Sequence, residues 1–181
     1  MRLTVQSLLF IFAALSCQQA VAADQAAAGF EKIRALIGEW EATQPDGKLM
    51  RVTYEEINGG AIEERYRSED PMWWNMSSVY YLDKDRIMMA HYCSWGNHPR
   101  MTAAVPEGEI SRLDFRFLDM ISAQPENGYM KDSSIQFQDK DHFAHRWLWH
   151  DKNGEKPLLL TLVRKKAAVA MEGGLKTAKQ D

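Results

Sequence analysis

The stretch LMRVTYEEINGGAIEERYR, residues 49–67, carries the clearest fold signal of the chain. Its side chains alternate with the period of two that is typical of β-strands. The run breaks at Asn58-Gly59-Gly60, which is a strong signal for the tight turn of a β-hairpin. We therefore predict two antiparallel strands, Leu49–Ile57 and Ala61–Arg67, joined by this turn.

The same pattern continues along the chain on both sides of this hairpin. Short runs with a period of two are separated by turn residues such as Gln44-Pro45-Asp46-Gly47 and Asp83-Lys84-Asp85. These connections leave no room for helical crossovers, so the strands form an antiparallel meander. The predicted strands are Glu39–Thr43, Leu49–Ile57, Ala61–Arg67, Met76–Leu82, Arg86–Cys93, Arg100–Val105, Ile110–Leu118, Met130–Gln138, His142–His150 and Pro157–Arg164.

One short helix precedes the strands. Phe30, Ile33, Leu36 and Ile37 recur at helical spacing, and Gly38 suits a left-handed cap. Residues 23–28, before this helix, are expected to form a loose leader. Ten strands in one open sheet would expose two edges, and closure into a barrel removes both. We predict an all-β fold, a single antiparallel up-and-down β-barrel of about ten strands over residues 23–164; a two-sheet sandwich fits the same pattern.

Residues 1–22 have the features of a secretory signal peptide. Arg2 gives a positive start, Leu8–Leu15 an apolar centre and Ala20-Val21-Ala22 a small-residue cleavage site. The apolar run is shorter than the roughly 20 residues that a membrane-spanning helix needs. We expect cleavage near Ala22, a periplasmic or secreted protein, and no integral membrane association. Lipid attachment at Cys17 is a less favoured alternative, because only Ala14 stands three positions before it.

The remaining chain has the composition of one globular domain. It would carry 21 basic and 25 acidic residues, a net charge of −4. The two signs are interspersed, so nothing indicates binding to nucleic acid. Cys93 would be the only cysteine, which excludes an intramolecular disulfide. Residues 165–181, rich in Ala, Lys and Gly, are predicted to be disordered. The oligomeric state is left open.

Three strand faces combine aromatic rings with ionisable or thiol groups, whereas small barrels usually keep one face apolar. Ionisable groups are costly in a dry core unless they are paired, so such faces favour a binding cavity. Trp40, Phe115 and Phe117 fit ordinary core packing better. The mixed faces are Phe143-His145-Trp147-Trp149, Met89-His91-Cys93, and Glu64-Tyr66 with Tyr54 on the neighbouring strand.

The stretch MMAHYCSWGNHPRM, residues 88–101, holds the densest group of chemically active side chains. His91 and Cys93 lie on the same side of one strand, and His98 follows a corner that could fold it back. A soft metal such as zinc or copper would accept these three residues. The sequence offers no further ligand at matched spacing, with Met89 and His145 as the remaining candidates.

Two other chemical interpretations of this stretch remain open. Cys93 could be a nucleophile with a histidine base, although the chain has no Gly-x-Ser-x-Gly elbow to support an enzyme. A haem could also bind, with His91, His145 or His98 as its axial ligand. Because no Cys-x-x-Cys-His is present, such a haem would be held non-covalently.

The segment Gly96-Asn97-His98-Pro99-Arg100 also fits a purely structural corner. Gly and Asn tolerate positive φ, and Pro fixes the exit from the turn. Arg100 would then pair with an acid such as Glu64, or it would point inward and hold a ligand carboxylate. Both alternatives stay open, because a one-residue change of register exchanges the two faces of a strand.

Several of these segments resemble an uncharacterised group of exported bacterial proteins. The similar segments are Leu36-Ile37-Gly38-Glu39-Trp40, His91-Tyr92-Cys93 and Gly96–Met101. The group resembles lipocalin-like, or calycin-type, barrels and the domain-of-unknown-function 1579 set, and no activity is assigned to it. It has Gln where this chain has His98, and often His where this chain has Tyr129. The resemblance therefore implies the barrel fold but no shared metal role for His98. Barrels of similar shape include fatty-acid-binding proteins and haem-binding nitrobindins, and fold alone does not fix function.

We predict an exported, non-catalytic barrel whose partner is a small, partly apolar molecule bound in its interior. One alternative is a haem- or metal-binding barrel, or an enzyme, that uses His91, Cys93 and His98. Another is a structural barrel with a filled interior. The predicted ligand-binding residues are Trp40, Tyr54, Glu64, Tyr66, His91, Cys93, Asn97, Arg100, His145 and Trp147.

Overall fold

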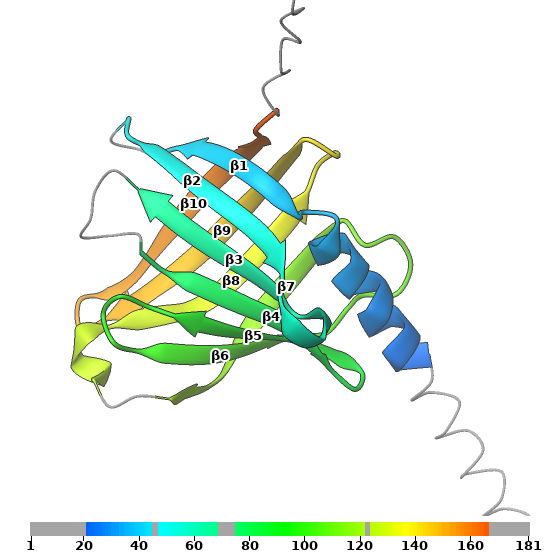
Figure 1. Ribbon diagram of the computed structural model, residues 1–181. Helices are drawn as coiled ribbons and strands as arrows, with labels where there is room; N and C mark the ends of the chain where they lie inside the picture. The colour runs from blue at the N-terminus through cyan, green and yellow to red at the C-terminus, as the bar shows by residue number, and fades with distance from the viewer. Residues whose placement is uncertain (1–20, 45–46, 69–74, 122–123, 167–181) are drawn as a thin grey trace, which may run out of the picture.

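Ten antiparallel strands form one closed barrel in the computed structural model, which describes residues 21–44, 47–68, 75–121 and 124–166 (Figure 1). Each strand pairs with its neighbours in sequence, and β1 also pairs with β10. The predicted up-and-down barrel is confirmed, and the sandwich alternative is wrong. The strands are β1 (Gly38–Thr43), β2 (Leu49–Glu56), β3 (Ile62–Ser68), β4 (Ser77–Asp83), β5 (Arg86–Tyr92), β6 (His98–Ala103), β7 (Arg112–Ile121), β8 (Tyr129–Phe137), β9 (His142–Asp151) and β10 (Gly154–Arg164).

The hairpin that carries the fold signal forms as expected. Strands β2 and β3 pair with Tyr54 opposite Glu64, and the connection is the short 3₁₀ turn η1 (Asn58–Gly60). Gly59 has φ 77° and Gly60 has φ 82°, a left-handed conformation that glycine adopts without steric cost. Asn58-Gly59-Gly60 therefore defines both the turn and the register of the two strands.

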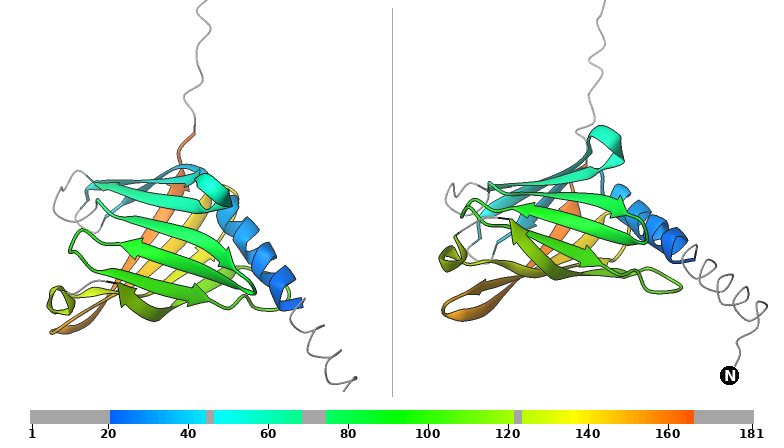
Figure 2. Two further views of the ribbon diagram at one scale, coloured as in Figure 1. Left: turned by 60° about the horizontal axis from the view of Figure 1, so that its bottom comes forward. Right: turned by 90° about the horizontal axis from the view of Figure 1, so that it is seen from below.

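A helix at residues 21–34 lies across one end of the barrel (Figures 1 and 2). Its face with Ala26, Phe30 and Ile33 is buried. The expectation of a loose leader at residues 23–28 is wrong, because this alanine-rich stretch has high helix propensity and packs on the barrel. Ile37 is 38% exposed rather than part of the apolar face, since the helix has ended before it. No helix among the described residues is long and apolar enough to cross a membrane.

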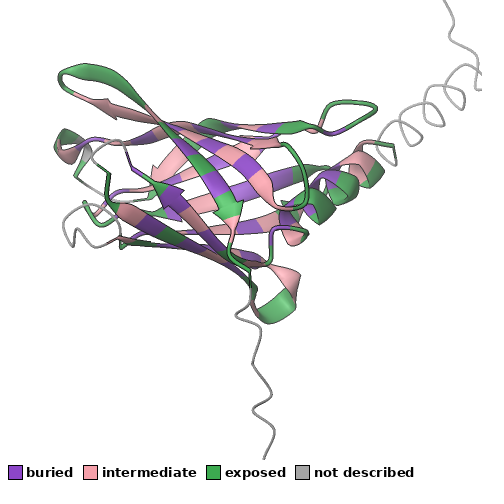
Figure 3. Cartoon of the chain, turned by 90° about the horizontal axis from the view of Figure 1, so that it is seen from above, coloured by how far each residue is buried: buried purple, intermediate pink, exposed green. Residues whose placement is uncertain are grey.

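The opposite end of the barrel is the mouth. It is bordered by the turn between β5 and β6, the loop that carries the 3₁₀ turn η2 (Pro125–Asn127), and the hairpin between β9 and β10. Buried and exposed residues alternate along most of the strands, so one face of each strand points into the barrel, where the core residues pack (Figure 3). A register shift between Met130 and Asp132 in β8 leaves Met130 opposite Trp149 of β9, and this bulge lies close to the mouth.

Some predictions fall outside the described residues. These include the signal segment up to residue 20 and the tail from residue 167. Lys165, which was assigned to the tail, is hydrogen-bonded through its backbone N–H and its Nζ to Glu39. Phe117 is 37% exposed and packs against Tyr129 on the surface, so its expected place in the core is wrong, whereas Phe115 is buried.

Candidate functional site

A buried carboxylate, Glu64 of β3, is the centre of a polar network inside the barrel. The hydroxyl groups of Tyr54 and Tyr66 both donate to its Oε1, the latter at 2.6 Å. The hydroxyl of Tyr80 donates to its Oε2 at 2.8 Å. All four residues are at most 1% exposed. Three strands thus direct hydroxyl donors at one acceptor, which satisfies a group that would otherwise be costly to bury.

His145 of β9 extends this network across the barrel. Its Nδ1 lies 3.0 Å from Glu64 Oε1 and 2.9 Å from the hydroxyl of Tyr66. Because an ionised carboxylate only accepts hydrogen bonds, Nδ1 must carry the hydrogen. On the other side of the ring, Nε2 lies 2.7 Å from the hydroxyl of Ser133, and Trp147 donates to the Tyr66 hydroxyl at 3.1 Å. Both nitrogens of His145 therefore have partners.

Electrostatics keep Glu64 ionised. Burial alone would raise the pKa of this carboxyl, but His145 and the hydroxyl donors Tyr54 and Tyr66 outweigh burial, so the pKa is lowered. The pKa of Tyr80 is raised well above its usual value, first by burial and then by the nearby negative charge of Glu64. The pKa values of Tyr54 and Tyr66 are likewise raised by burial and by Glu64, so the three tyrosines stay protonated and donate hydrogen bonds to the carboxylate at neutral pH.

His91 of β5 is the one inward-facing histidine with a free ring nitrogen among the described residues. Its Nδ1 lies 3.0 Å from the hydroxyl of Ser78, and its ring packs on Trp147 with the centroids 4.7 Å apart. Its Nε2 is buried without a hydrogen-bond partner. Burial, despite an opposing effect of Glu64, lowers the pKa of His91 to about 4. The imidazole is thus neutral at physiological pH.

The structure separates the other predicted site residues from this network. Trp40 is packed at the helix end of the barrel, where its Nε1 donates to the carbonyl of Leu36 at 2.7 Å. Asn97 is buried at the mouth, and its Nδ2 donates to the carbonyls of Gln124 and Gly128 at 2.6 and 2.8 Å. Asn97 therefore joins two mouth loops.

Arg100 lies on the outer surface of the barrel. Its Nε donates to Asp119 Oδ1 at 2.6 Å, and a second bond joins the same two groups. The expected pairing with Glu64 is wrong, because Met101 and not Arg100 points inward on β6. His98, on the same face as Arg100, packs its ring against Tyr92 at 5.4 Å.

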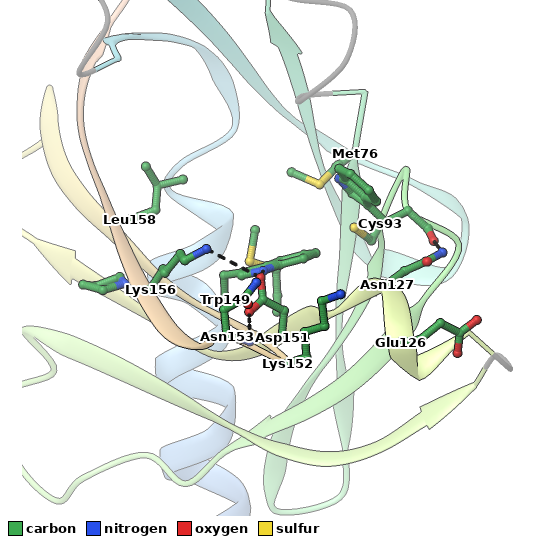
Figure 4. A pocket seen from close by; sticks show the side chains of 13 residues that line it. Met76, Cys93, Glu126, Asn127, Trp149, Asp151, Lys152, Asn153, Lys156 and Leu158 are labelled. Carbon is green, nitrogen blue, oxygen red and sulfur yellow. Dashed lines mark hydrogen bonds and ion pairs between the residues drawn. The ribbon is translucent and has the colours of Figure 1, made fainter.

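A cavity of about 430 Å³ opens at the mouth (Figure 4). Met76 and Cys93 lie on one side of it, and Trp149 and Leu158 lie on the other. Its volume falls within the range of about 300–1,000 Å³ that is typical of small-molecule sites. The lining residues are Met76, Cys93, Trp95, Glu126, Asn127, Met130, Trp149, Asp151, Lys152, Asn153, Lys156, Pro157 and Leu158.

The walls of this mouth cavity are held by hydrogen bonds between loops. The indole N–H of Trp149 donates to Asp151 at 3.0 Å, and Asn127 donates to the carbonyl of Trp95 at 3.1 Å. Gly128 has φ 77°, and a methyl group on it would lie 2.5 Å from the Trp149 ring. A glycine at this position therefore lets the loop lie directly against the tryptophan.

Only Cys93, of the residues predicted to bind ligand, lines the mouth cavity. The network residues Tyr54, Glu64, Tyr66 and His145 do not. The sequence grouped Trp149 with His145 and Trp147 on one strand face, and Trp95 lies in the stretch at residues 88–101, but neither tryptophan was proposed as a site residue. Met130 carried no usable signal, because the bulge in β8 determines where it points.

The predicted metal and haem sites are not assembled. His91 and Cys93 face inward while His98 faces outward, so these three residues do not converge. No group of three His, Cys, Asp or Glu residues in the described part of the chain is placed to hold a metal ion. For haem, both nitrogens of His145 are engaged, and neither His91 nor His98 lines the mouth cavity. These residues do not fit an axial ligand, and no haem chemistry follows from them.

Comparison with known proteins supports the fold. No family model matches the chain, and no curated protein matches it. Among solved structures, Rv2717c from M. tuberculosis is similar with a TM-score of 0.54 and 10% sequence identity, over 77% of this chain and 98% of that chain. At this identity the likeness concerns the fold alone. The resemblance to the domain-of-unknown-function 1579 set stays a prediction, and the chain is similar to Rv2717c in its barrel architecture.

Proposed function

We propose that this protein is an exported barrel that binds a small, partly apolar molecule in its mouth cavity without transforming it. The observation that carries the proposal is the cavity of about 430 Å³ at the end of the barrel that the helix does not cover. Export rests on the sequence of residues 1–22, and the composition favours neither nucleic acid nor a membrane as the partner.

The chemistry of the cavity walls supports this choice of ligand. Met76, Met130, Trp149 and Leu158 present thioether, aromatic and aliphatic surface. Such surface favours apolar parts of a ligand, because their transfer from water contributes roughly 25 cal/mol per Å². The polar or charged lining residues come from the 3₁₀ turn η2 and the β9–β10 hairpin, and they are Glu126, Asn127, Asp151, Lys152, Asn153 and Lys156. Lys152 extends its side chain toward the cavity from this hairpin (Figure 4). A ligand with an apolar body and a polar end fits this distribution.

The middle of the barrel is a poor place for the ligand. Glu64 and His145 are fully buried and already bonded to protein partners. A ligand group that displaced one of these partners would leave a buried polar atom unpaired, which costs about 1–3 kcal/mol. The polar network is therefore better suited to holding the strands of the barrel in register.

Titration of the purified protein with the fluorescent probe anilinonaphthalene sulfonate tests the proposal. We expect saturable binding of one equivalent. Leu158→Asp, which places a charge in the cavity, should weaken it by roughly tenfold or more, since burial of a leucine contributes about 1.5–3 kcal/mol. Leu159→Asp is the matched control, because Leu159 is 61% exposed on the outer face. Equal affinity of the two variants, or no saturable binding, would overturn the proposal in favour of a structural barrel. If the probe binds as expected, native mass spectrometry of protein from its own host would identify a retained ligand.

A further inference from the structure

Three sulfur-containing side chains border the mouth cavity. Cys93 follows β5, Met76 precedes β4, and Met130 belongs to β8. They are 4%, 5% and 6% exposed, so the protein holds all three sulfurs away from bulk water while they face one space. Cys93 is a free cysteine, and the proposed binding of an organic ligand does not use its thiol.

Strand register places Met76 and Cys93 side by side. Ser78 pairs with His91 and Ser77 with Tyr92, so the next position of the ladder sets Met76 across from Cys93. Facing residues have Cβ atoms about 5 Å apart, and Figure 4 shows the two side chains together on one wall of the cavity. Their backbones are anchored, since the Met76 carbonyl accepts from Tyr66 N–H at 2.9 Å and the Cys93 carbonyl accepts from Gly96 N–H at 3.1 Å.

We propose that the mouth cavity contains a site for a soft monovalent metal ion, such as Cu(I), held by Cys93, Met76 and Met130. Thiolate and thioether ligands select Cu(I) over harder divalent ions. The rings of Trp95 and Trp149, whose centroids are 6.2 Å apart, border the same cavity and add favourable contacts to a cation. On binding, the Cys93 thiol releases its proton to solvent and the thiolate coordinates the metal, with no change in oxidation state.

Ag(I), a redox-inert substitute for Cu(I), tests the proposal in chloride-free buffer. Binding is followed by quenching of tryptophan fluorescence and by native mass spectrometry. Because any thiol binds Ag(I), the methionines are decisive. We expect one equivalent to bind, about 100-fold weaker binding in Cys93→Ser, and about tenfold weaker binding in Met76→Leu and in Met130→Leu. Met89→Leu, a buried methionine outside the cavity, should bind as the unaltered protein does.

Met-to-Leu changes conserve volume and cost little stability, so folding does not obscure the result. If Cys93→Ser weakens binding while Met76→Leu and Met130→Leu bind normally, the metal is held by a bare thiol and the proposal is wrong. It is also wrong if Met89→Leu weakens binding as much as Met76→Leu does. The outcome is separate from that of the proposed function, because Met76→Leu keeps the cavity apolar and should still bind anilinonaphthalene sulfonate.

Discussion

Acidification should destabilise this barrel in part through the buried residue His91. Its pKa is lowered from 6.5 to about 4 by burial, while an unfolded chain would protonate it near its usual value. A histidine whose pKa is lower in the folded state than in the unfolded state stabilises the fold. This contribution to stability is fully present above the pKa of the unfolded state. That stability is lost as the pH falls toward the folded pKa, since only the unfolded state then takes up the proton.

The size of the effect follows from the two pKa values. Between pH 7 and pH 5 the free energy of unfolding should fall by about 2 kcal/mol, and by about 3 kcal/mol at pH 4. His91→Phe removes the titrating group and keeps an aromatic ring against Trp147. The pH dependence of this variant should be flatter by that amount, even though losing the bond to Ser78 shifts its stability at every pH.

Urea unfolding at pH 7 and pH 5 measures these free energies. His142→Gln is the control, because His142 is an exposed histidine on the same barrel, and this variant should keep the His91-dependent loss. Proton NMR of the His91 ring gives its titration midpoint directly, expected near pH 4. Parallel stability curves for the unaltered protein and His91→Phe, or a midpoint near 6.5, would refute the account of a buried neutral imidazole.

Four further substitutions test other parts of the structure. Glu64→Gln should lower the free energy of unfolding by about 3 kcal/mol at pH 7. In denaturant titrations, the difference between this variant and the unaltered protein should shrink below about pH 4.5. The reason is that the lowered pKa of Glu64 gives the folded state stability that is lost as the pH falls through this pKa. Gly128→Ala should lower the free energy of unfolding, measured by thermal unfolding, by about 3 kcal/mol and should weaken probe binding. Gly59→Ala should lower it by only about 1 kcal/mol, because Gly59 has the same φ of 77° but open space around it. Arg100→Ala should change stability by at most about 1 kcal/mol and leave probe binding unaltered, because its pair with Asp119 lies on the outer surface; a tenfold loss of probe affinity would instead place Arg100 in the site.

The strands could be predicted from sequence because their signals are local. The alternation of side chains and the turn residues predicted all ten strands. Because ten strands in one open sheet would expose two edges, their number also predicted closure into a barrel. The sequence also grouped Glu64 with Tyr66, and His145 with Trp147, on shared strand faces, and the structure buries all four residues. Which face points inward was left open. What these faces form was not predictable, because a satisfied network and a cavity wall have the same pattern of residues.

The remaining errors depend on distances and register across the barrel. Tyr80 and Ser133 complete the polar network from strands whose sequence gave no hint of it. A register shift beside Arg100 accompanies its pairing with Asp119, and a second shift brings Met130 to the mouth. A single inserted residue at a bulge changes the face of the residues that follow it, and no periodicity reveals such a position in advance.

The location of the binding site is the central claim, and methionine methyl NMR tests it directly. Met76 and Met130 line the mouth cavity, whereas Met89 and Met101 are fully buried in the barrel outside it. Titration with anilinonaphthalene sulfonate should shift the methyl signals of Met76 and Met130 saturably and leave those of Met89 and Met101 in place. Shifts at Met89 and Met101, with Met76 and Met130 unchanged, would contradict a site at the mouth.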